Sequence, residues 1–410
     1  MARLLIISTN YAPEVTGVGP YVAVVARSLA AAGHEVDVIA GLPHYPAWRI
    51  AAGVPRKLRW NEADGRVVVH RRAHYVPSRP SALGRAALEG TFLLQGMLGV
   101  PRGMDAVIGV VPSLADGLLA RIIASVLRVP YALVFQDLVG RAAEQSGTAG
   151  GSRVAAVTSR AEAWATRRAR LLGMITPSFG PYLESLGASP DAFVTLRNWS
   201  RARVARTPRD ETRSRLGWGS DFVVLHAGNM GMKQGLEQVV DAAAMAARLG
   251  SRIRFVLVGD GNQRAHIAAL GAAVPTLELR PLLPEAELAD VLAAADVLLI
   301  SERATLLDMS LPSKLTTYLA AGRPVVAAVP PGGVTAGEVV RSGGGIVVPA
   351  GRPDDLLGEL ERLKSNPNVG AGLVDAGQAF ARDQLDEATA LARYREFVDR
   401  LLSPNAQETK

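Results

Sequence analysis

One segment combines closely spaced glycines with a single cation: Gly228-Asn229-Met230-Gly231-Met232-Lys233-Gln234-Gly235. An apolar run, Phe222–Ala227, precedes it and an amphipathic run, Leu236–Leu249, follows, which predicts a turn from a strand into a helix. Backbone N–H groups at a helix start, with an ammonium group nearby, bind a diphosphate well. The segment is not a P-loop, because Lys233 precedes its last glycine and no Ser or Thr follows to hold Mg²⁺. We therefore expect a diphosphate site at Gly228 and Lys233, with a solvated surface lysine as the alternative.

A second helix start lies at Pro312-Ser313-Lys314, after a loop of charged and small residues. Gly322 ends the predicted helix. In doubly wound sheets, ligands bind at the carboxyl ends of the strands, where such helices begin. Ser313, Lys314 and Thr317 can therefore meet phosphate or ribose hydroxyls, and an ordinary helix cap with a solvated lysine is the alternative.

A third helix start is the Gly17-Val18-Gly19 turn, which Pro20 follows. Pro suits the first turn of a helix, and unpaired N–H groups there favour phosphate. The turn resembles half of a dinucleotide-binding fingerprint, but seven residues separate it from the predicted strand Arg3–Thr9. A plain structural turn is an equally open interpretation.

The elements that must position these turns alternate between strand and helix, which predicts parallel sheets with helices on both faces. In the first half, the predicted strands are Arg3–Thr9, Glu35–Ala40, Ala106–Val111 and Tyr131–Phe135. The pattern restarts with strands Phe222–Ala227, Arg254–Val258, Val297–Ile300 and Pro324–Ala328, and with helices Leu236–Leu249, Ala286–Ala294 and Leu315–Ala321. The restart follows a stretch of low periodicity, so we place a domain boundary within 199–218.

A chain of 410 residues suits two domains. We expect residues 1–200 and 201–384 to form one Rossmann-like domain each, and the amphipathic helix 385–403 to pack on the second or complete the first. The chain contains no cysteine, which excludes disulfides and thiolate metal sites. We find no signal peptide and no apolar stretch long enough to span a bilayer. These observations predict a cytoplasmic protein.

The positive charge is concentrated in the first half. Residues 1–200 hold 21 basic and 13 acidic residues, whereas residues 201–410 hold 24 and 25. Such an excess suits an anionic partner, namely nucleic acid, a phospholipid surface or a phosphorylated molecule. A genome that favours arginine is the alternative for the composition, but it does not explain the asymmetry.

Several motifs together resemble family 4 of the retaining glycosyltransferases, which have the GT-B fold of two Rossmann-like domains with parallel sheets facing across a cleft. The opening Asn10-Tyr11-x-Pro13-Glu14-x-x-Gly17-x-Gly19 is followed by Gly33-His34-Glu35-Val36. The other motifs, in family order, are His44-Tyr45-Pro46, Gln136-Asp137-Leu138, Arg197-Asn198-Trp199, Ala227-Gly228-Asn229, Val258-Gly259-Asp260-Gly261 and Pro312-Ser313-Lys314. The branch that they resemble is the colanic-acid and O-antigen type, with N-acetyl-fucosamine transferases that use a UDP-sugar.

The resemblance implies a nucleotide diphosphate sugar as donor, without a metal or other cofactor, and retention of configuration. Lys233 would pair the diphosphate, with Asn229 where many relatives carry Arg. Gly17 and Gly19 would lie near the donor phosphates and the acceptor. The remaining donor-side residues would be Arg280 and Leu282 at the base, Thr317 or Asp308 at the ribose, and Glu338 at the sugar hydroxyls.

The ribose site departs from the family pattern. Met309 and Thr317 stand where many relatives carry the Glu-x7-Glu pair that holds the ribose, so this carboxylate pair is absent here. On the acceptor side, the resemblance implies His44, Tyr45 and Asp137. Asp137 follows a predicted strand, and its carboxylate can accept a proton from the acceptor hydroxyl or orient the sugar; a structural cap is the alternative.

The acceptor partner is expected to be a polysaccharide precursor or a lipid-diphosphate-linked molecule. The segment Gly84–Gly99 carries the apolar side chains Leu88, Phe92, Leu93, Met97 and Leu98, and basic clusters lie at 56–59, 70–72 and 160–170. This combination suits peripheral docking on an anionic bilayer at its inner face, with a buried helix as the alternative. Nucleic acid is not expected, since the clusters lack interleaved stacking aromatics.

Two other functions remain open from the sequence. A sugar-nucleotide 2-epimerase has a similar two-domain fold and would convert the donor without an acceptor. A non-catalytic, membrane-associated homologue would keep the fold without the reaction, and the absent carboxylate pair is compatible with it.

Overall fold

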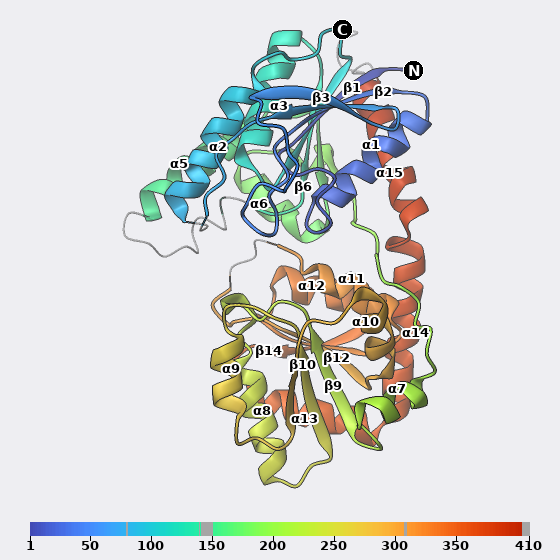
Figure 1. The fold of residues 1–410 in the computed structure, drawn as a ribbon. Helices are drawn as coiled ribbons and strands as arrows, with labels where there is room; N and C mark the ends of the chain where they lie inside the picture. The colour runs from blue at the N-terminus through green and yellow to red at the C-terminus, as the bar shows by residue number, and fades with distance from the viewer. Residues whose placement is uncertain (79–80, 139, 141–150, 307–309, 404–410) are drawn as a thin grey trace. The chain divides into compact units, whose positions relative to one another are not determined.

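The computed structural model of this 410-residue chain describes all residues except 79–80, 139, 141–150, 307–309 and 404–410 (Figure 1). Its internal contacts divide the chain into two units, Met1–Asn198 with Ala390–Lys410, and Trp199–Thr389. The helix α15 (Glu387–Leu402) therefore begins in the second unit and continues into the first. There its Arg395 Nη1 donates to Ser28 Oγ at 3.2 Å.

The first unit is built on an eight-stranded sheet in the order β3-β4-β2-β1-β5-β6-β7-β8. The strands are β1 (Arg3–Ser8), β2 (Glu35–Ala40), β3 (Arg59–Asp64), β4 (Val67–Arg72), β5 (Ala106–Val111), β6 (Tyr131–Phe135), β7 (Leu171–Met174) and β8 (Phe193–Thr195). All neighbours pair in parallel except β3 and β4, which are antiparallel. The chain order reverses between β1 and β5, and this is where parallel sheets of this kind bind ligands.

Helices cover both faces of this sheet: Figure 1 shows α2, α3 and α5 on one side and α1 with α15 on the other. Their bounds are α1 (Gly19–Ala31), α2 (Ala82–Gly96), α3 (Leu114–Leu127), α5 (Gly151–Thr166) and α6 (Gly180–Ser185). The first helix starts with Pro20 in its first turn and buries Val22, Val25 and Leu29 at helical spacing. Gly33, just beyond its end, has φ of +100°, which glycine adopts without strain.

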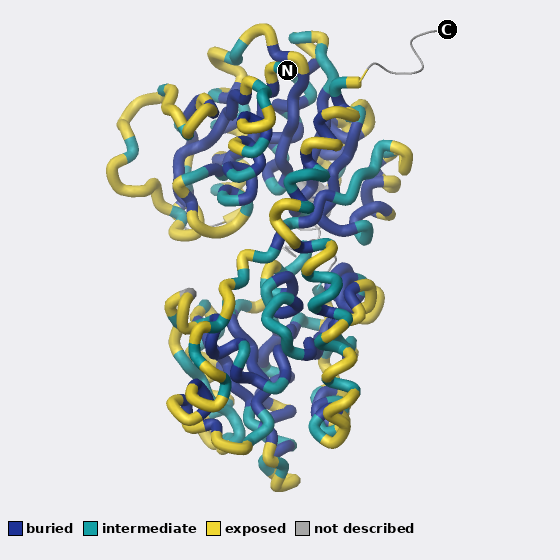
Figure 2. The backbone as a smooth tube through the Cα atoms, turned by 90° about the vertical axis from the view of Figure 1, so that its right-hand side faces the viewer, coloured by how far each residue is buried: buried dark blue, intermediate teal, exposed yellow. Residues whose placement is uncertain are grey.

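The second unit has a six-stranded, fully parallel sheet in the order β11-β10-β9-β12-β13-β14. The strands are β9 (Phe222–Ala227), β10 (Ile253–Val258), β11 (Leu277–Arg280), β12 (Val297–Ser301), β13 (Val325–Val329) and β14 (Gly345–Pro349). Successive residues pack to opposite sides: Val224 joins one apolar cluster and Leu225 the other. The predicted two-domain α/β fold with parallel sheets is therefore confirmed, and Figure 2 shows buried chain inside each unit.

The helices of the second unit include several that the sequence does not predict. They are α7 (Arg209–Leu216), α8 (Glu237–Arg248), α9 (Arg264–Gly271), α10 (Glu285–Ala294), α11 (Ser313–Ala320), α12 (Val334–Ser342), α13 (Pro353–Ser365) and α14 (Pro367–Gln384). The helices that the sequence does not predict are α7, α9, α12, α13 and α14. Of these, α7 lies within the predicted boundary segment. Polar bonds hold it: Arg213 Nη1 donates to the carbonyl oxygen of Ala294 at 2.9 Å and to Asp296 Oδ2 at 3.0 Å.

The loops after β9 and β10 run against each other without side chains between them. Gly228 N donates to Val258 O at 2.9 Å, and Met230 N donates to Asp260 O at 2.8 Å. Gly259 has φ of +144°, and a Cβ atom there would lie 1.9 Å from Gly228 O. Only glycine fits at position 259, because both its conformation and its neighbour exclude a side chain.

We predict that Gly259→Ala lowers the free energy of unfolding by roughly 3 kcal/mol or more, because the methyl group must displace the Gly228 backbone. Gly358→Ala is the matched control. Gly358 lies in α13, and a Cβ atom there would meet no other atom within 4 Å, so alanine should raise stability by about 0.5–1 kcal/mol. Urea unfolding of the full chain, followed by circular dichroism, checks both. Equal midpoints for the two variants would contradict the prediction.

Candidate functional site

The glycine-rich segment of the second unit leaves the carboxyl end of β9. Lys233 is exposed on a short 3₁₀ turn, Met232–Gln234, and its carbonyl oxygen accepts a hydrogen bond from Arg303 N at 3.0 Å. The Gln234 side chain closes the turn by accepting from Gly231 N at 3.0 Å. Gly235 then adopts φ of +51° before α8 begins. The segment therefore has the strand-to-helix geometry that the sequence predicts.

A second lysine reaches this loop from α11. Lys314 is half-buried, and its Nζ lies 3.2 Å from His226 Nε2 and 3.4 Å from the position of a Cβ atom on Gly228. Burial lowers the pKa of Lys314 to about 8, although the nearby Glu302 carboxylate raises it. The structure thus brings Gly228 and Lys314 together, 86 positions apart in the chain.

Tyr318 anchors α11 to the end of β9. Its hydroxyl group accepts from Ala227 N at 2.7 Å and donates to Ala227 O at 3.1 Å. The ring is buried, and burial raises the pKa of this phenol, so the hydroxyl stays protonated at neutral pH. The helix start that carries Lys314 is therefore fixed relative to the Gly228 loop.

The candidates for the ribose and the sugar lie on two helices beside this loop. Ser313 is exposed and Thr317 half-buried on α11, while Glu338 is buried on α12 and paired with Arg341 at 2.5 Å. Asp308 lies outside the described residues. Sequence reasoning missed Glu302, which directly follows β12 and accepts from Thr335 Oγ1 at 2.7 Å.

The two residues expected at the base occupy different environments. Arg280 ends β11 and donates through Nη2 to Leu216 O at 3.0 Å, and it is ion-paired with Glu278. Leu282, two residues on, leaves 69% of its surface exposed. Arg280 thus ties α7 to the sheet, and Leu282 offers an open apolar side chain.

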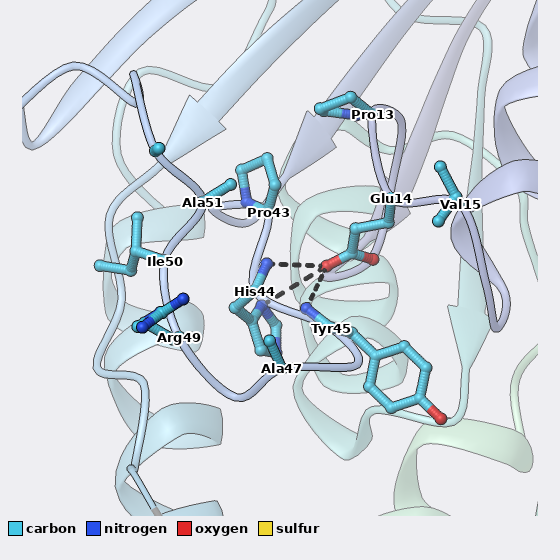
Figure 3. Close-up of a pocket in the computed structure, with 11 residues that line it drawn as sticks. Pro13, Glu14, Val15, Pro43, His44, Tyr45, Ala47, Arg49, Ile50 and Ala51 are labelled. Carbon is cyan, nitrogen blue, oxygen red and sulfur yellow. Dashed lines mark hydrogen bonds and ion pairs between the residues drawn. The ribbon is translucent and has the colours of Figure 1, made fainter. Parts of the chain in front are cut away.

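In the first unit, a buried carboxylate organises the loops that follow β1 and β2. Glu14 Oε1 accepts hydrogen bonds from the backbone N–H groups of His44 and Tyr45, both at 3.0 Å (Figure 3). Its Oε2 accepts from Asn10 Nδ2 at 2.9 Å. Glu14 belongs to the motif between Asn10 and Gly19, but the sequence alone assigned it no role. Its position as a carboxylate in a loop with Gly and Pro was the only indication of a function in the sequence.

These loops line a cavity of about 300 Å³. Its lining consists mostly of small and apolar residues and includes one arginine: Pro13, Glu14, Val15, Pro43, His44, Tyr45, Ala47, Arg49, Ile50, Ala51 and Ala52. Gly17 and Gly19 lie at its edge, since Cβ atoms there would meet the Tyr45 ring at 3.0 Å and Glu14 Oε2 at 3.2 Å. The structure therefore brings four of the predicted residues, Gly17, Gly19, His44 and Tyr45, into one place.

Histidines beside the cavity have defined hydrogen bonds. His44 Nδ1 lies 2.8 Å from Leu42 O, and His74 Nδ1 lies 3.0 Å from Tyr75 O, so each donates there when neutral. His74 Nε2 accepts from Leu42 N at 3.0 Å. Burial lowers the pKa of His74 to about 4, which keeps it neutral at physiological pH.

Asp137 lies two strands away from β1 in the sheet order, directly after β6, and is half-buried. The preceding residue, Gln136, accepts from Asn198 Nδ2 at 2.6 Å through Oε1. This bond ties the end of β6 to Asn198, where the first stretch of this unit ends. Asp137 thus sits at the carboxyl edge of the sheet, as the sequence predicts.

Two further carboxyl groups, which sequence reasoning also missed, are buried where the order of the first sheet reverses. Asp116 accepts from Thr9 N at 2.9 Å and from Thr9 Oγ1 at 2.7 Å. Glu89 accepts from Ser113 Oγ and from Ala115 N, both at 2.7 Å. Burial raises the pKa of both carboxyl groups. They fix the loops after β1 and β5 to each other and to the start of α3.

Metal clusters and membrane spans are both absent from the described part of the chain. Within it, no three His, Cys, Asp or Glu side chains gather in a way that could hold a metal ion. The helices that the structure describes include none long and apolar enough to span a membrane.

Comparison with known families and proteins gives matches over both units. Residues 16–199 match the glycosyl transferase 4-like domain, and residues 221–366 match glycosyl transferases group 1. A protein of Escherichia coli (strain K12) named as the colanic acid biosynthesis glycosyl transferase WcaI is 30% identical over 339 residues, which cover 78% of this chain and 81% of that protein.

Solved structures share the fold at low identity. Sucrose-phosphate synthase from Thermosynechococcus elongatus superposes with a TM-score of 0.73 at 16% identity, covering 98% of this chain and 99% of that one. HepE of Anabaena, in complex with UDP, gives a TM-score of 0.66 at 16% identity, covering 97% of this chain and 100% of that one. With the match to the Escherichia coli protein, these results show that the chain belongs to the glycosyltransferase family and is a hexosyltransferase with the GT-B fold.

Proposed function

We propose that this enzyme transfers a sugar from a UDP-sugar to a lipid-linked or polysaccharide-precursor acceptor, with retention of configuration. UDP is the favoured nucleotide, and an N-acetylated amino sugar is one candidate for the transferred sugar. The name of the Escherichia coli relative, which refers to colanic acid biosynthesis, supports a polysaccharide precursor. The UDP bound to HepE supports the choice of base.

The observation that carries this proposal is the presence of two lysines at one glycine loop. Lys233 lies on the loop itself, and Lys314 Nζ lies against Gly228. The order of the strands reverses between β9 and β12, beside this loop, and ligands bind at such a position in doubly wound sheets. Two ammonium groups and a bare backbone suit a diphosphate, which needs charge and close approach together.

The reaction breaks the bond between the sugar C1 and the diphosphate oxygen, and the electron pair leaves with UDP. The acceptor hydroxyl oxygen forms the new bond to C1, and in our proposal its proton passes to the Asp137 carboxylate. Lys233 and Lys314 stabilise the charge that develops on the leaving diphosphate, in the role that a metal ion has in other transferases. No bound metal or other cofactor is part of this scheme.

The remaining donor contacts are also proposals. We assign the Ser313 and Thr317 hydroxyls on α11 to the ribose, because the family's carboxylate pair is absent here. Leu282 is open to pack on the base, and Arg280 supports that strand end. Glu338 stays a candidate for the sugar hydroxyls, and Asp308 stays one for the ribose hydroxyls. Asn229, which is exposed on the loop, stays a candidate for the diphosphate.

The acceptor is proposed to bind in the first unit, at the cavity bounded by Gly17, Gly19, His44 and Tyr45. Arg49 gives this apolar cavity a cation, which suits a molecule with an anionic group beside an apolar part. A lipid diphosphate carrying a saccharide has both features.

A stripe on α2 supports peripheral binding to the cytoplasmic face of a membrane. Leu88 and Phe92 are buried against the core, so the face of α2 that carries them is a packed helix face, as the alternative to membrane docking predicts. Leu83, Ala87 and Leu94 recur on the opposite face, with Leu83 85% and Leu94 70% exposed. Exposed arginines lie at both ends of this α2 stripe: Arg85 on the helix, and Arg59 beside Gly99. Apolar side chains flanked by cations suit an anionic bilayer.

We predict that Leu94→Ser reduces co-sedimentation with anionic vesicles, because it removes apolar surface from the α2 stripe. Leu249→Ser is the control, since Leu249 is 75% exposed but lies after α8 in the other unit. Binding of the unchanged protein should also weaken between low and high salt. Failure of the unchanged protein to sediment at low salt would refute membrane binding.

We predict that Lys233→Ala lowers turnover at saturating donor by about 10²–10³-fold, because one stabilising charge on the leaving diphosphate is lost. The variant should fold normally, since the side chain is exposed. Lys364→Ala serves as control, because Lys364 pairs with Glu361 on α13 and lies outside the proposed site. Turnover equal to that of the unchanged enzyme would remove Lys233 from the mechanism.

We predict that Asp137→Asn lowers kcat by at least about 10²-fold while the KM for the donor changes little, because the amide cannot accept the acceptor's proton. Measuring both constants with the donor and a lipid-linked acceptor checks this. A raised KM with unchanged kcat would show instead that Asp137 only orients the sugar. A control reaction with the donor alone measures the release of UDP without acceptor, and this rate is subtracted from the rate with acceptor.

A further inference from the structure

We propose that His226 is a positioning residue that holds Lys314, so that this lysine supplies a second cation for the donor's diphosphate at a loop where Asn229 contributes no charge. The inference rests on the proposed function, since it assigns the diphosphate to this loop. It adds a residue on a buried strand to the machinery of donor binding.

The hydrogen bonds of the His226 ring define its role. His226 is 0% exposed on β9, and its Nδ1 lies 3.2 Å from Leu299 O on β12. A carbonyl oxygen only accepts, so the neutral tautomer with its hydrogen on Nδ1 satisfies Leu299 and leaves Nε2 as an acceptor; the backbone of Asn229 also hydrogen-bonds the ring. Lys314 Nζ, 3.2 Å from Nε2, is the donor that fills this position.

The ring must be neutral for this arrangement, and its surroundings keep it so. Burial and the neighbouring Lys314 ammonium lower the pKa of His226 well below its ordinary value. A protonated ring would have no acceptor at Nε2 and would repel Lys314. The imidazole therefore acts as a fixed acceptor across the physiological pH range.

The bond to His226 directs the lysine toward the loop. One N–H of the ammonium group is used, and the other two remain for an anion. Gly228 has φ of +133°, and a Cβ atom there would lie 3.4 Å from Lys314 Nζ, so any other residue would crowd the ammonium group. Tyr318 fixes the helix to Ala227, the residue between His226 and Gly228.

The titratable groups that face Lys314 come from three elements. They are His226 on β9, Glu302 after β12 and Tyr318 on α11 itself. Glu302 Oε1 accepts from Thr335 Oγ1, and burial raises the pKa of Tyr318, so the Tyr318 hydroxyl stays protonated near neutral pH. Lys314 is therefore the group whose charge changes as pH rises from 7 to 9, since its pKa is about 8.

The sign of the pH effect follows from the charge. A diphosphate binds the ammonium form, and that form falls about tenfold in population between pH 7 and pH 9. The terminal phosphate of UDP is already mostly ionised at pH 7 and only gains negative charge as the pH rises, so its own ionisation does not weaken binding to a cation in this window. Because loss of the ammonium charge is expected to weaken binding about tenfold, the affinity for UDP should fall about fivefold from pH 7 to pH 9 in the unchanged protein.

Isothermal titration of the full chain with UDP at pH 7 and pH 9 tests the proposal. Lys314→Met should bind about tenfold more weakly at pH 7 and show no pH step. His226→Ala should resemble it, because the lysine loses its anchor, and the double variant should lose little more than either single one. His226→Gln should recover part of the affinity, since its carbonyl oxygen can accept from Lys314.

The outcomes separate the inference from the proposed function. If the unchanged protein does not bind UDP, the proposed function fails. If it binds and folded His226→Ala keeps the same affinity and the same pH step, the positioning role is overturned. Should His226→Ala not fold, an unchanged affinity and pH step in Lys314→Met would overturn it equally. His266→Ala, on exposed α9, is the control and should bind as the unchanged protein does.

Discussion

The arrangement of the Gly228 loop depends on one close backbone approach, that of Gly259 to the carbonyl group of Gly228. No side chain fits between them, so the loops after β9 and β10 share hydrogen bonds beyond the ends of their strands. Lys314 Nζ also lies against Gly228, 3.4 Å from the position of a Cβ atom there. A larger residue at either glycine would separate the loop from its support or from its cation.

In the first unit, a buried carboxylate rather than a close backbone contact holds two loops together. Glu14 gathers two N–H groups of the 44–45 loop and the amide of Asn10, so the loops after β1 and β2 meet at one carboxylate. Arg71, itself 2% exposed, donates to Gly41 O at 3.0 Å and to Ala12 O, which supports the same two loops from beneath. Charge-assisted bonds to a buried group are strong, and losing a partner is costly. These hydrogen bonds therefore fix the positions of the loops that line the cavity beside Glu14.

The sequence predicted strands that consist mostly of apolar residues, such as Glu35–Ala40 and Phe222–Ala227, which agree with the structure to the residue. It missed short apolar strands such as β7 and β14, and also elements held by polar contacts. The helix α7 has almost no apolar periodicity, and Arg213 holds it through bonds to residues more than 80 positions away. His226 was overlooked for a related reason: a lone histidine in an apolar strand indicates a satisfied core residue unless its partner, 88 positions on, is known.

The choice of a histidine to hold Lys314 has an electrostatic reason. A half-buried ammonium loses hydration, which is why its pKa falls, and in the site that we propose it would act on a phosphate through a medium of lower dielectric constant. A carboxylate in the place of His226 would restore the lysine's pKa, but it would also neutralise the charge that we assign to diphosphate binding. A neutral imidazole fixes the direction of the ammonium and leaves its charge available. Lys233, by contrast, is exposed to water on a short turn, so the two cations differ in how far the protein desolvates each of them.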